Sequence, residues 1–435
     1  MTIDYDGWII LIGVLVAACC AIPGSWLVVR GMGMMGDAIS HAVLPGIALG
    51  FMFSGSRSGG WMFLGAALSA AAAAVLTQTI HRWGRVERGA AMGLVFTTFF
   101  SLGLLLIVQT ADSVDLDPNC VLYGSIELAP LDTLSMGGVD VPRMIVPLGL
   151  VLAANVLVTI VLYKELLASS FDAALATAQG FSARWLHLGL MVLTAATCVA
   201  CFEAVGSIIT VALLVAPPAA ALLLTRHMRW VIVWATVLGS LAAVVGHVSA
   251  VTVPGWILAA PLDTSSAGMM AVAAAGIFLL VALVAPGRGV LMRRMAARRD
   301  AMQIAIEDAL GLLFRLEERS VHASRAEVEE LLRSDVRVGS RLGAVLGRLR
   351  RGALVALHQD TWRLTDHGRA EARTLVRAHR LWETYLAGHA SIPDSHLHAA
   401  AERLEHVSDA AVAEALEAEV GQTRDDPHGR PIPPG

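Results

Sequence analysis

Two polar side chains stand four residues apart in an otherwise apolar stretch near the N-terminus. They are Asp37 and His41, within the sequence GDAISHAVLPG of residues 36–46. Four residues is close to one helical turn, so the two side chains would share one face of a helix. A carboxylate and an imidazole that face together supply half of the ligands of a first-row divalent metal site. The alternative is a polar pair whose members only satisfy each other at a helix interface.

A second group of imidazole and carboxylate side chains lies in the C-terminal third of the chain. His379 and Glu383 are again four apart, and four further residues follow at spacings of four, three and one. A set of this kind without thiolates suits manganese or iron(II) as well as zinc. The alternative is the solvated face of amphipathic helices, but the shared register favours metal. The four further residues are His398, Glu402, Glu405 and His406.

The charged residues are divided unevenly between two parts of the chain. Of its 435 residues 56% are hydrophobic, and the mean hydropathy of +0.65 excludes an ordinary soluble protein. Residues 1–287 carry 10 Lys and Arg and 14 Asp and Glu, whereas residues 288–435 carry 22 of each kind. We therefore expect a membrane domain followed by a soluble domain. Because the second part has no basic excess, its composition gives little support to nucleic-acid binding.

Nine stretches are long and apolar enough to cross a membrane, which takes about 20 residues. Basic residues are retained on the cytoplasmic side, and here most of them follow the first, third, fifth, seventh and ninth stretches, with Arg57 after the second as an exception. We therefore expect a multi-pass membrane protein, with its N-terminus outside and its C-terminal domain in the cytoplasm. The stretches are 8–28, 38–54, 60–79, 90–109, 144–163, 185–203, 205–224, 230–249 and 268–286.

Two more polar residues, Glu203 and His247, lie within or beside these stretches. A charged carboxylate at the centre of a span is unfavourable by about 2.5–3.5 kcal/mol, so such residues have a specific place in the structure. Each of the two stands alone along the sequence, which favours a role in helix packing or in facing a lumen.

The stretch of residues 35–46 resembles the signature of the permeases of metal-ion ABC importers for manganese, zinc or iron, and the resemblance extends over about 5–295. It implies that Asp37 and His41 line the translocation pathway and bind the metal there. It also implies that residues 165–182 dock onto a cytoplasmic ABC ATPase dimer. An extracytoplasmic metal-binding protein and a second permease copy or paralogue would be the other partners, and the membrane would be the bacterial plasma (inner) membrane. The segments 122–126, 170–172, 204–219 and 262–268 agree in order and spacing.

The chain does not contain the loop with which such transporters hold ATP. A P-loop needs a lysine within Gly-x-x-x-x-Gly-Lys-Ser/Thr, and the single lysine of this chain, Lys164, lacks the glycines. We therefore expect a transporter subunit without enzyme activity, with ATP hydrolysis on a separate chain and no covalently bound cofactor. Divalent metal (Mn²⁺ first, Fe²⁺ or Zn²⁺ next) would be the substrate and a regulatory ligand.

The soluble part shows an order of elements typical of a winged helix. Helices are expected over 300–318, 323–333 and 337–351, followed by two short strands in 353–366. Further helices are expected over 367–389 and 394–421. The predicted domains are thus a permease domain 1–290, a winged-helix-like domain 296–368 and a helical metal-binding or dimerisation domain 369–422. The Pro/Gly-rich residues 423–435 are expected to be disordered.

Over about 300–422 this part resembles the diphtheria toxin repressor family of metal-dependent regulators, through residues 364–369, 379–383 and 402–406. The resemblance implies one metal site at His379, Glu383 and His398. A second site would consist of Asp308, Glu402, Glu405 and His406, of the manganese type. Gly311 stands where that type has a further carboxylate. Gly339, Gly343 and Gly347 in the presumed recognition helix argue against sequence-specific DNA binding, because each destabilises a helix by about 1 kcal/mol.

The sequence thus predicts an all-α polytopic membrane protein of about nine transmembrane helices with a mainly α winged-helix-type cytoplasmic domain. Its expected function is that of an ABC metal-importer permease whose tail senses metal. The alternative is a membrane-tethered, metal-dependent transcription regulator, in which the spans only anchor or sense. An intramembrane enzyme has little support, since the chain has no helical HExxH motif and no paired catalytic aspartates.

Overall fold

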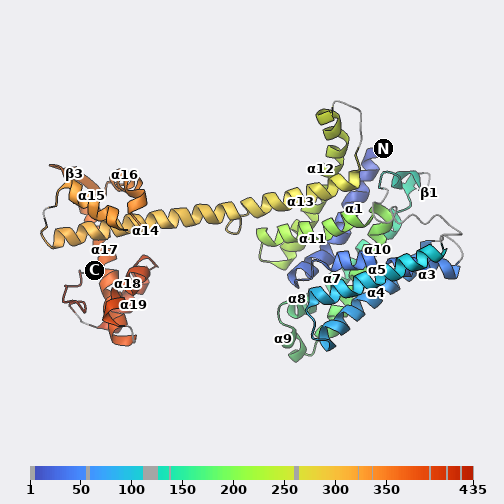
Figure 1. Ribbon diagram of the computed structural model, residues 1–435, viewed down its shortest axis with the longest axis horizontal. Helices are drawn as coiled ribbons and strands as arrows, with labels where there is room; N and C mark the ends of the chain where they lie inside the picture. Colours follow the sequence, from blue (N-terminus) through green and yellow to red (C-terminus); the bar gives the residue numbers. More distant parts are fainter. Residues whose placement is uncertain are drawn as a thin grey trace. The chain divides into compact units, whose positions relative to one another are not determined.

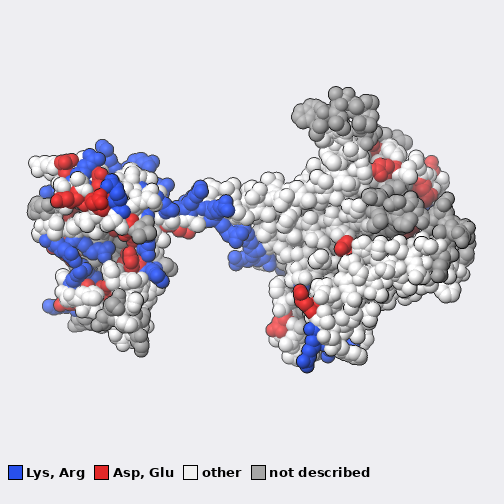
Figure 2. Space-filling model, in the orientation of Figure 1, with Lys and Arg blue, Asp and Glu red and all other residues white. Residues whose placement is uncertain are grey.

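The computed structural model describes residues 5–54, 59–110, 126–136, 139–258, 264–321, 323–335, 337–390, 393–407, 410–421 and 424–434. The chain divides into two compact units, Met1–Met292 and Arg293–Gly435. Both are mainly helical (Figure 1), and the only sheets among the described residues are two hairpins. Charged side chains cover the second unit densely, whereas the visible face of the first unit is nearly free of them (Figure 2).

The first unit is a bundle of apolar helices. Eight are long and apolar enough to cross a membrane, and the bent pair α7 and α8 would make a ninth span. The prediction of about nine spans is therefore confirmed. The helices are α1 Tyr5–Val29, α2 Met35–Ala42, α3 Leu44–Ser54, α4 Gly59–Trp83, α5 Arg88–Thr110, α7 Ile145–Val161, α8 Tyr163–Phe171, α9 Ala173–Ala178, α10 Ala183–Val205, α11 Ser207–Leu224, α12 Met228–Leu258 and α13 Ser266–Val284; between α5 and α7 lie the 3-10 turn η1 Ala129–Leu131 and the hairpin β1 Thr133–Met136 and β2 Val139–Pro142.

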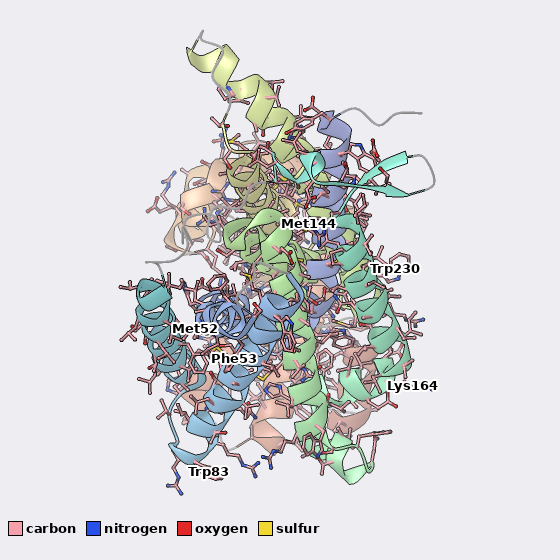
Figure 3. The ribbon with its side chains drawn as sticks, turned by 90° about the vertical axis from the view of Figure 1, so that its right-hand side faces the viewer. Met52, Phe53, Trp83, Met144, Lys164 and Trp230 are labelled. Carbon is pink, nitrogen blue, oxygen red and sulfur yellow. The ribbon has the colours of Figure 1, made fainter. Side chains whose placement is uncertain are left out.

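Helix α1 lies at the centre of this bundle and packs against α7, α10, α11 and α12. It is apolar on all sides, as a helix surrounded by others must be. Large apolar side chains on the outer helices are exposed instead, among them Phe53 and Trp230 (Figure 3). Small residues allow the closest approaches: a Cβ added to Gly46 of α3 would collide with the backbone of Gly65 in α4.

Three interruptions shape these spans. The stretch predicted as one span over 38–54 is broken at Val43 into α2 and α3, with Pro45 in the first turn of α3, where proline is tolerated. Helices α7 and α8 meet at an angle of 73°. Gly206 alone separates α10 from α11, and its φ of 83° is a conformation that favours glycine.

The second unit begins within a long helix and continues with shorter ones. Ser324 and Glu327 form a capping box at the start of α15, and Thr365 caps α17. Strands β3 and β4 pair in register around Gln359 and Asp360, as the predicted hairpin requires. The elements are α14 Val290–Glu318, α15 Arg325–Ser334, η2 Gly339–Arg341, α16 Leu342–Arg351, β3 Val355–His358, β4 Thr361–Leu364, α17 Asp366–His389, α18 Asp394–Leu404, η3 Glu405–Val407 and α19 Ala410–Val420.

Residues 424–434, which the composition led us to expect as disordered, pack against α17. The Asp426 carboxylate is buried 3.7 Å from the Arg380 guanidinium, and that guanidinium also donates hydrogen bonds to Glu318 and to the carbonyl of Pro431. Arg380 itself is 2% exposed. A buried guanidinium needs such partners, which composition alone does not reveal.

Candidate metal sites

The first tail cluster consists of His379, Glu383 and His398, whose ligand atoms lie within 4.8 Å of one another. One turn of α17 separates His379 from Glu383, and their Nε2 and Oε1 atoms are 3.1 Å apart. Helix α18 packs on α17 and brings His398 Nδ1 to 2.8 Å from the same Oε1 atom. The structure therefore brings together the three residues predicted for one site.

Two further residues lie next to this cluster: Glu405, which was predicted for the other site, and His428, which was not predicted. Glu405, predicted for the other site, hydrogen-bonds to His379 Nδ1, the ring nitrogen away from Glu383. A carboxylate in that position fixes the tautomer and orientation of a ligand imidazole. His428 Nε2 lies 3.9 Å from Glu383 Oε1 and comes from the segment expected to be disordered, so no local pattern could have indicated it.

The charges within this cluster favour a cation. Burial opposes protonation of His379, but its hydrogen bonds to Glu383 and Glu405 outweigh burial and raise its pKa to about 9. Burial likewise tends to raise the pKa of Glu383, yet the hydrogen bonds from His379 and His398 lower it below the ordinary value. Without metal, a protonated imidazole therefore supplies the positive charge that a divalent ion would bring.

The second tail cluster consists of Asp308, Glu405 and His406, again within 4.8 Å. Helix α14 supplies Asp308, whose Oδ1 atom is 3.1 Å from His406 Nε2, and η3 supplies the other two residues. Asp308 Oδ2 and His406 Nε2 are buried and have no hydrogen-bond partner among the residues that the structure describes. Both atoms still have charged neighbours: Arg337 Nη1 lies 3.6 Å from Asp308 Oδ2, and Asp308 Oδ1 lies 3.1 Å from His406 Nε2. Buried ligand atoms without a hydrogen bond fit a metal ion.

A neighbouring carboxylate orients His406. Glu307 Oε2 lies 2.6 Å from His406 Nδ1, on the side of the ring away from Asp308. Burial opposes protonation of His406, but its close contacts with the carboxylates of Asp308 and Glu307 raise its pKa to about 9. Glu307 was not predicted; its position next to Asp308 in α14 is the only signal in the sequence.

Glu402, predicted as a ligand of the second site, faces an arginine instead. Its Oε1 atom is 3.7 Å from Arg337 Nη1, and the same nitrogen is 3.6 Å from Asp308 Oδ2. A cation of the protein thus lies between two of the carboxylates predicted to bind metal. Arg337 comes just before η2 and α16, far from both carboxylates in the sequence, so only the folded chain reveals this contact.

The pair in the membrane unit is simpler. Asp37 Oδ1 and His41 Nε2 are 3.7 Å apart across one turn of α2, and their side chains are 48% and 27% exposed. The imidazole stacks on Phe96 and meets the edge of Phe100, both in α5. Among the described residues, no third carboxylate, imidazole or thiol completes a group of three with this pair.

The predicted ATPase-docking segment 165–182 forms the short helices α8 and α9. Asp172 separates them, and its carboxylate accepts hydrogen bonds from the first amides of α9. Arg30, just after α1, donates hydrogen bonds of 2.9 Å to Ser169 and Ser170 of α8. The segment is thus tied to the end of the central helix, a connection suited to carrying movement into the bundle.

Comparison with known proteins identifies both units. The model of the ABC 3 transport family matches residues 4–285, and that of the iron dependent repressor, metal binding and dimerisation domain, matches residues 365–434. The zinc transport system membrane protein TroD of Treponema pallidum is 37% identical over 366 residues, which cover 83% of this chain and 96% of TroD. The manganese transport system membrane protein MntD of Bacillus subtilis is 37% identical over 293 residues, 67% of this chain and 96% of MntD.

A solved structure agrees with these relatives. PsaBC from Streptococcus pneumoniae in complex with Fab superposes with a TM-score of 0.54 at 28% identity, covering 67% of this chain and 95% of that chain. The chain therefore belongs to the ABC 3 transport family, as a membrane permease subunit that carries a metal-binding domain of the iron-dependent-repressor type.

Proposed function

We propose that this permease imports Mn²⁺ and that Asp37 and His41 bind the ion on its way through the membrane. The observation that carries the proposal is the placement of these two ligands on one face of α2, at a break in an otherwise apolar span. Carboxylate and imidazole also bind Fe²⁺ and Zn²⁺. Manganese comes first because the tail clusters contain oxygen and nitrogen ligands without a thiolate, and because MntD is a manganese transport protein.

We further propose that a separate ATPase dimer drives transport by docking onto α8 and α9. The contacts of Arg30 with Ser169 and Ser170 support this role, since they join the docking segment to the central helix. A binding protein would deliver the ion on the extracytoplasmic side, and a second permease copy or paralogue would complete the pathway. The N-terminus would then lie outside the cell, and the second unit would lie in the cytoplasm with the ATPase.

Uptake of radiolabelled Mn²⁺ tests the transport proposal. Metal-starved cells lacking their own importer would express this chain with its ATPase and its binding protein. We expect uptake that requires the ATPase Walker lysine and that excess unlabelled Mn²⁺ suppresses at lower concentration than Zn²⁺ or Fe²⁺ does. Stronger suppression by Zn²⁺ would reassign the substrate, and uptake that persists without ATPase activity would contradict the proposal.

The second unit, in this proposal, reports the cytoplasmic metal level and slows transport when metal is replete. It would comprise a winged-helix-like part, 296–368, and a metal-binding part, 369–422. The two tail clusters support the role because most of their residues are buried and because each cluster joins several elements. Arg337 supports it as well, since metal at the second cluster would compete with its guanidinium for Asp308.

A comparison of starved and replete cells tests this brake. In the wild type, preloading with Mn²⁺ should lower the subsequent rate of uptake. Deletion of residues 296–435, or Glu383→Gln in the full chain, should leave uptake insensitive to preloading while starved-cell uptake stays near the wild-type rate. Inhibition that is unchanged in both variants would refute the sensing role.

A further inference from the structure

A second pair of ligand-type residues lies in the membrane unit, away from Asp37 and His41. His247 of α12 is buried, at 4% exposure, and its Nε2 atom lies 3.5 Å from Oδ1 of Asp6, in the first turn of α1. The two residues are separated by most of the unit in sequence. His247 stands alone along the sequence, but in the folded chain the packing of α1 against α12 brings it next to Asp6.

The other ring nitrogen of His247 is already engaged. His247 Nδ1 lies 3.1 Å from the hydroxyl of Ser266, at the start of α13. The backbone amide of Ser266 donates a 2.7 Å hydrogen bond to the Glu127 carboxylate, which thereby caps α13. These contacts fix the ring so that Nε2 points toward Asp6. Fixing one imidazole nitrogen to orient the other is the usual arrangement around a metal-binding histidine.

The atom that faces Asp6 is unpaired. His247 Nε2 is buried and makes no hydrogen bond to any residue that the structure describes. When Nδ1 donates its hydrogen to Ser266, Nε2 carries no hydrogen and can only accept. Nε2 and the Asp6 carboxylate oxygen, 3.5 Å apart, are then two acceptors with no donor between them. A cation between them satisfies both. Asp6, with its side chain 62% exposed, leaves room for water to complete the shell of such an ion.

We propose that Asp6 and His247 form a second station for the transported divalent cation. Helix α1, of 25 residues and about 37 Å long, separates this pair from the Arg30 end of the unit. Only residues 30–34 join α1 to α2, so Asp37 and His41 lie toward that other end. The inference rests on the proposed function: in the proposed orientation the new pair is at the outer mouth, where the ion arrives.

Metal-catalysed oxidation tests the station directly. The full chain, assembled with its ATPase in lipid nanodiscs, would be treated with Fe²⁺ and ascorbate in air, which oxidises histidines that hold the iron. Peptide mass spectrometry then reports the 2-oxo-histidine content of each position. We expect modification at both His247 and His41, and protection of both by excess Zn²⁺, which is redox-inactive.

Substitution of the exposed partner separates a bound ion from general damage. Asp6→Asn should lower modification of His247 at least fivefold and leave His41 unaffected. The matched control is Asp140→Asn, an exposed aspartate of β2 that hydrogen-bonds to Ser135. Because Asp6 is largely exposed, its substitution should not disturb folding, and an unchanged elution volume checks this. Equal modification of His247 in wild type and Asp6→Asn would overturn the proposal.

The outcomes also distinguish this inference from the proposed function. Modification of His41 without His247 would show that Asp6 and His247 are only a polar pair, while the transport site stands. Modification of neither would contradict both. In uptake assays, Asp6→Asn should raise the half-saturating metal concentration several-fold with little change in the maximal rate, since a station at the mouth mainly affects capture of the ion.

Discussion

The membrane pair and the tail clusters use the same two ligand types in opposite ways. Asp37 and His41 are adjacent on one short helix, partly exposed, and lie against two phenylalanine rings. Each tail cluster joins residues from two or more elements and buries most of them among further carboxylates. Affinity rises with ligand count, ligand charge and rigidity of the site. In the function we propose, the site that must release its ion is thus open and sparse, whereas the sites that report metal are more buried and have more ligands.

The largest expected effect comes from removing one ligand of the membrane pair, Asp37 or His41. We expect Asp37→Asn or His41→Gln to reduce Mn²⁺ uptake by more than about tenfold, because a site with two protein ligands has none to spare. Metal bound by the tail should not change. Uptake in cells and equilibrium binding to the purified chain measure the two effects. His227→Gln, an exposed histidine between α11 and α12, is the control, and unimpaired uptake in both variants would remove these residues from the pathway.

The crowded site should also lose affinity when one ligand is neutralised, but without an effect on starved-cell transport. Glu383→Gln removes the carboxylate shared by His379 and His398, and we expect about 10- to 100-fold weaker binding at the first tail cluster. Isothermal titration of the full chain with Mn²⁺ measures it. Glu371→Gln is a matched control, since Glu371 and His367 make an exposed pair of the same spacing in the same helix. Equal losses in the two variants would argue against a site at Glu383.

A smaller change in metal affinity is expected when Arg337, which lies between two carboxylates, is replaced. Arg337→Gln removes a cation that lies near Asp308 and Glu402, so metal should bind the second tail cluster about two- to fivefold more tightly. The size follows from the contribution of a partly exposed ion pair, about 0–1 kcal/mol. Arg333→Gln, which breaks only the surface pair with Glu330, serves as the comparison. Weaker binding in Arg337→Gln would mean that the guanidinium supports the site.

The smallest expected effect is on the stability of the metal-free second unit. The pKa values of His379 and His406 are raised from 6.5 to about 9 in the folded state. Their stabilising contribution is therefore fully present below pH 6.5 and is lost as the pH rises through about 9. Hydrogen exchange in α17 and η3, corrected for the intrinsic rate, should become faster between pH 7 and 9.5 without metal. Saturating Mn²⁺ should suppress the change, because the ion replaces the protons.

Much of the fold follows from the sequence, since a bundle in lipid is apolar both inside and outside. Hydropathy therefore predicts the spans, but it does not reveal where they break. Val43 lies in an uninterrupted apolar run, and Pro45 is the only sign that α2 ends there. The predicted helix over 394–421 is likewise interrupted, at η3, and this interruption places Glu405 and His406 beside Asp308.

For the candidate sites too, the sequence predicts local relations but not contacts between distant segments. Spacing of four predicts Asp37 with His41 and His379 with Glu383, because one helical turn is a local relation. Contacts of Arg337 with Glu402, or of Asp6 with His247, join segments that are distant in the sequence, and no pattern announces them. The grouping of Glu402 with Asp308 came from resemblance alone. In the structure Arg337 stands beside both.

The contacts of the buried Arg380 guanidinium have a consequence for the order in which parts of this protein can fold during synthesis. Its partners Asp426 and Pro431 lie about fifty residues further along the chain, so a ribosome completes the membrane spans and α17 before it supplies them. Until then Glu318 is the one partner of the Arg380 guanidinium, among those that the structure describes, that has been made. In the function we propose, a nonsense change near codon 420 would therefore yield a permease whose brake on transport is defective.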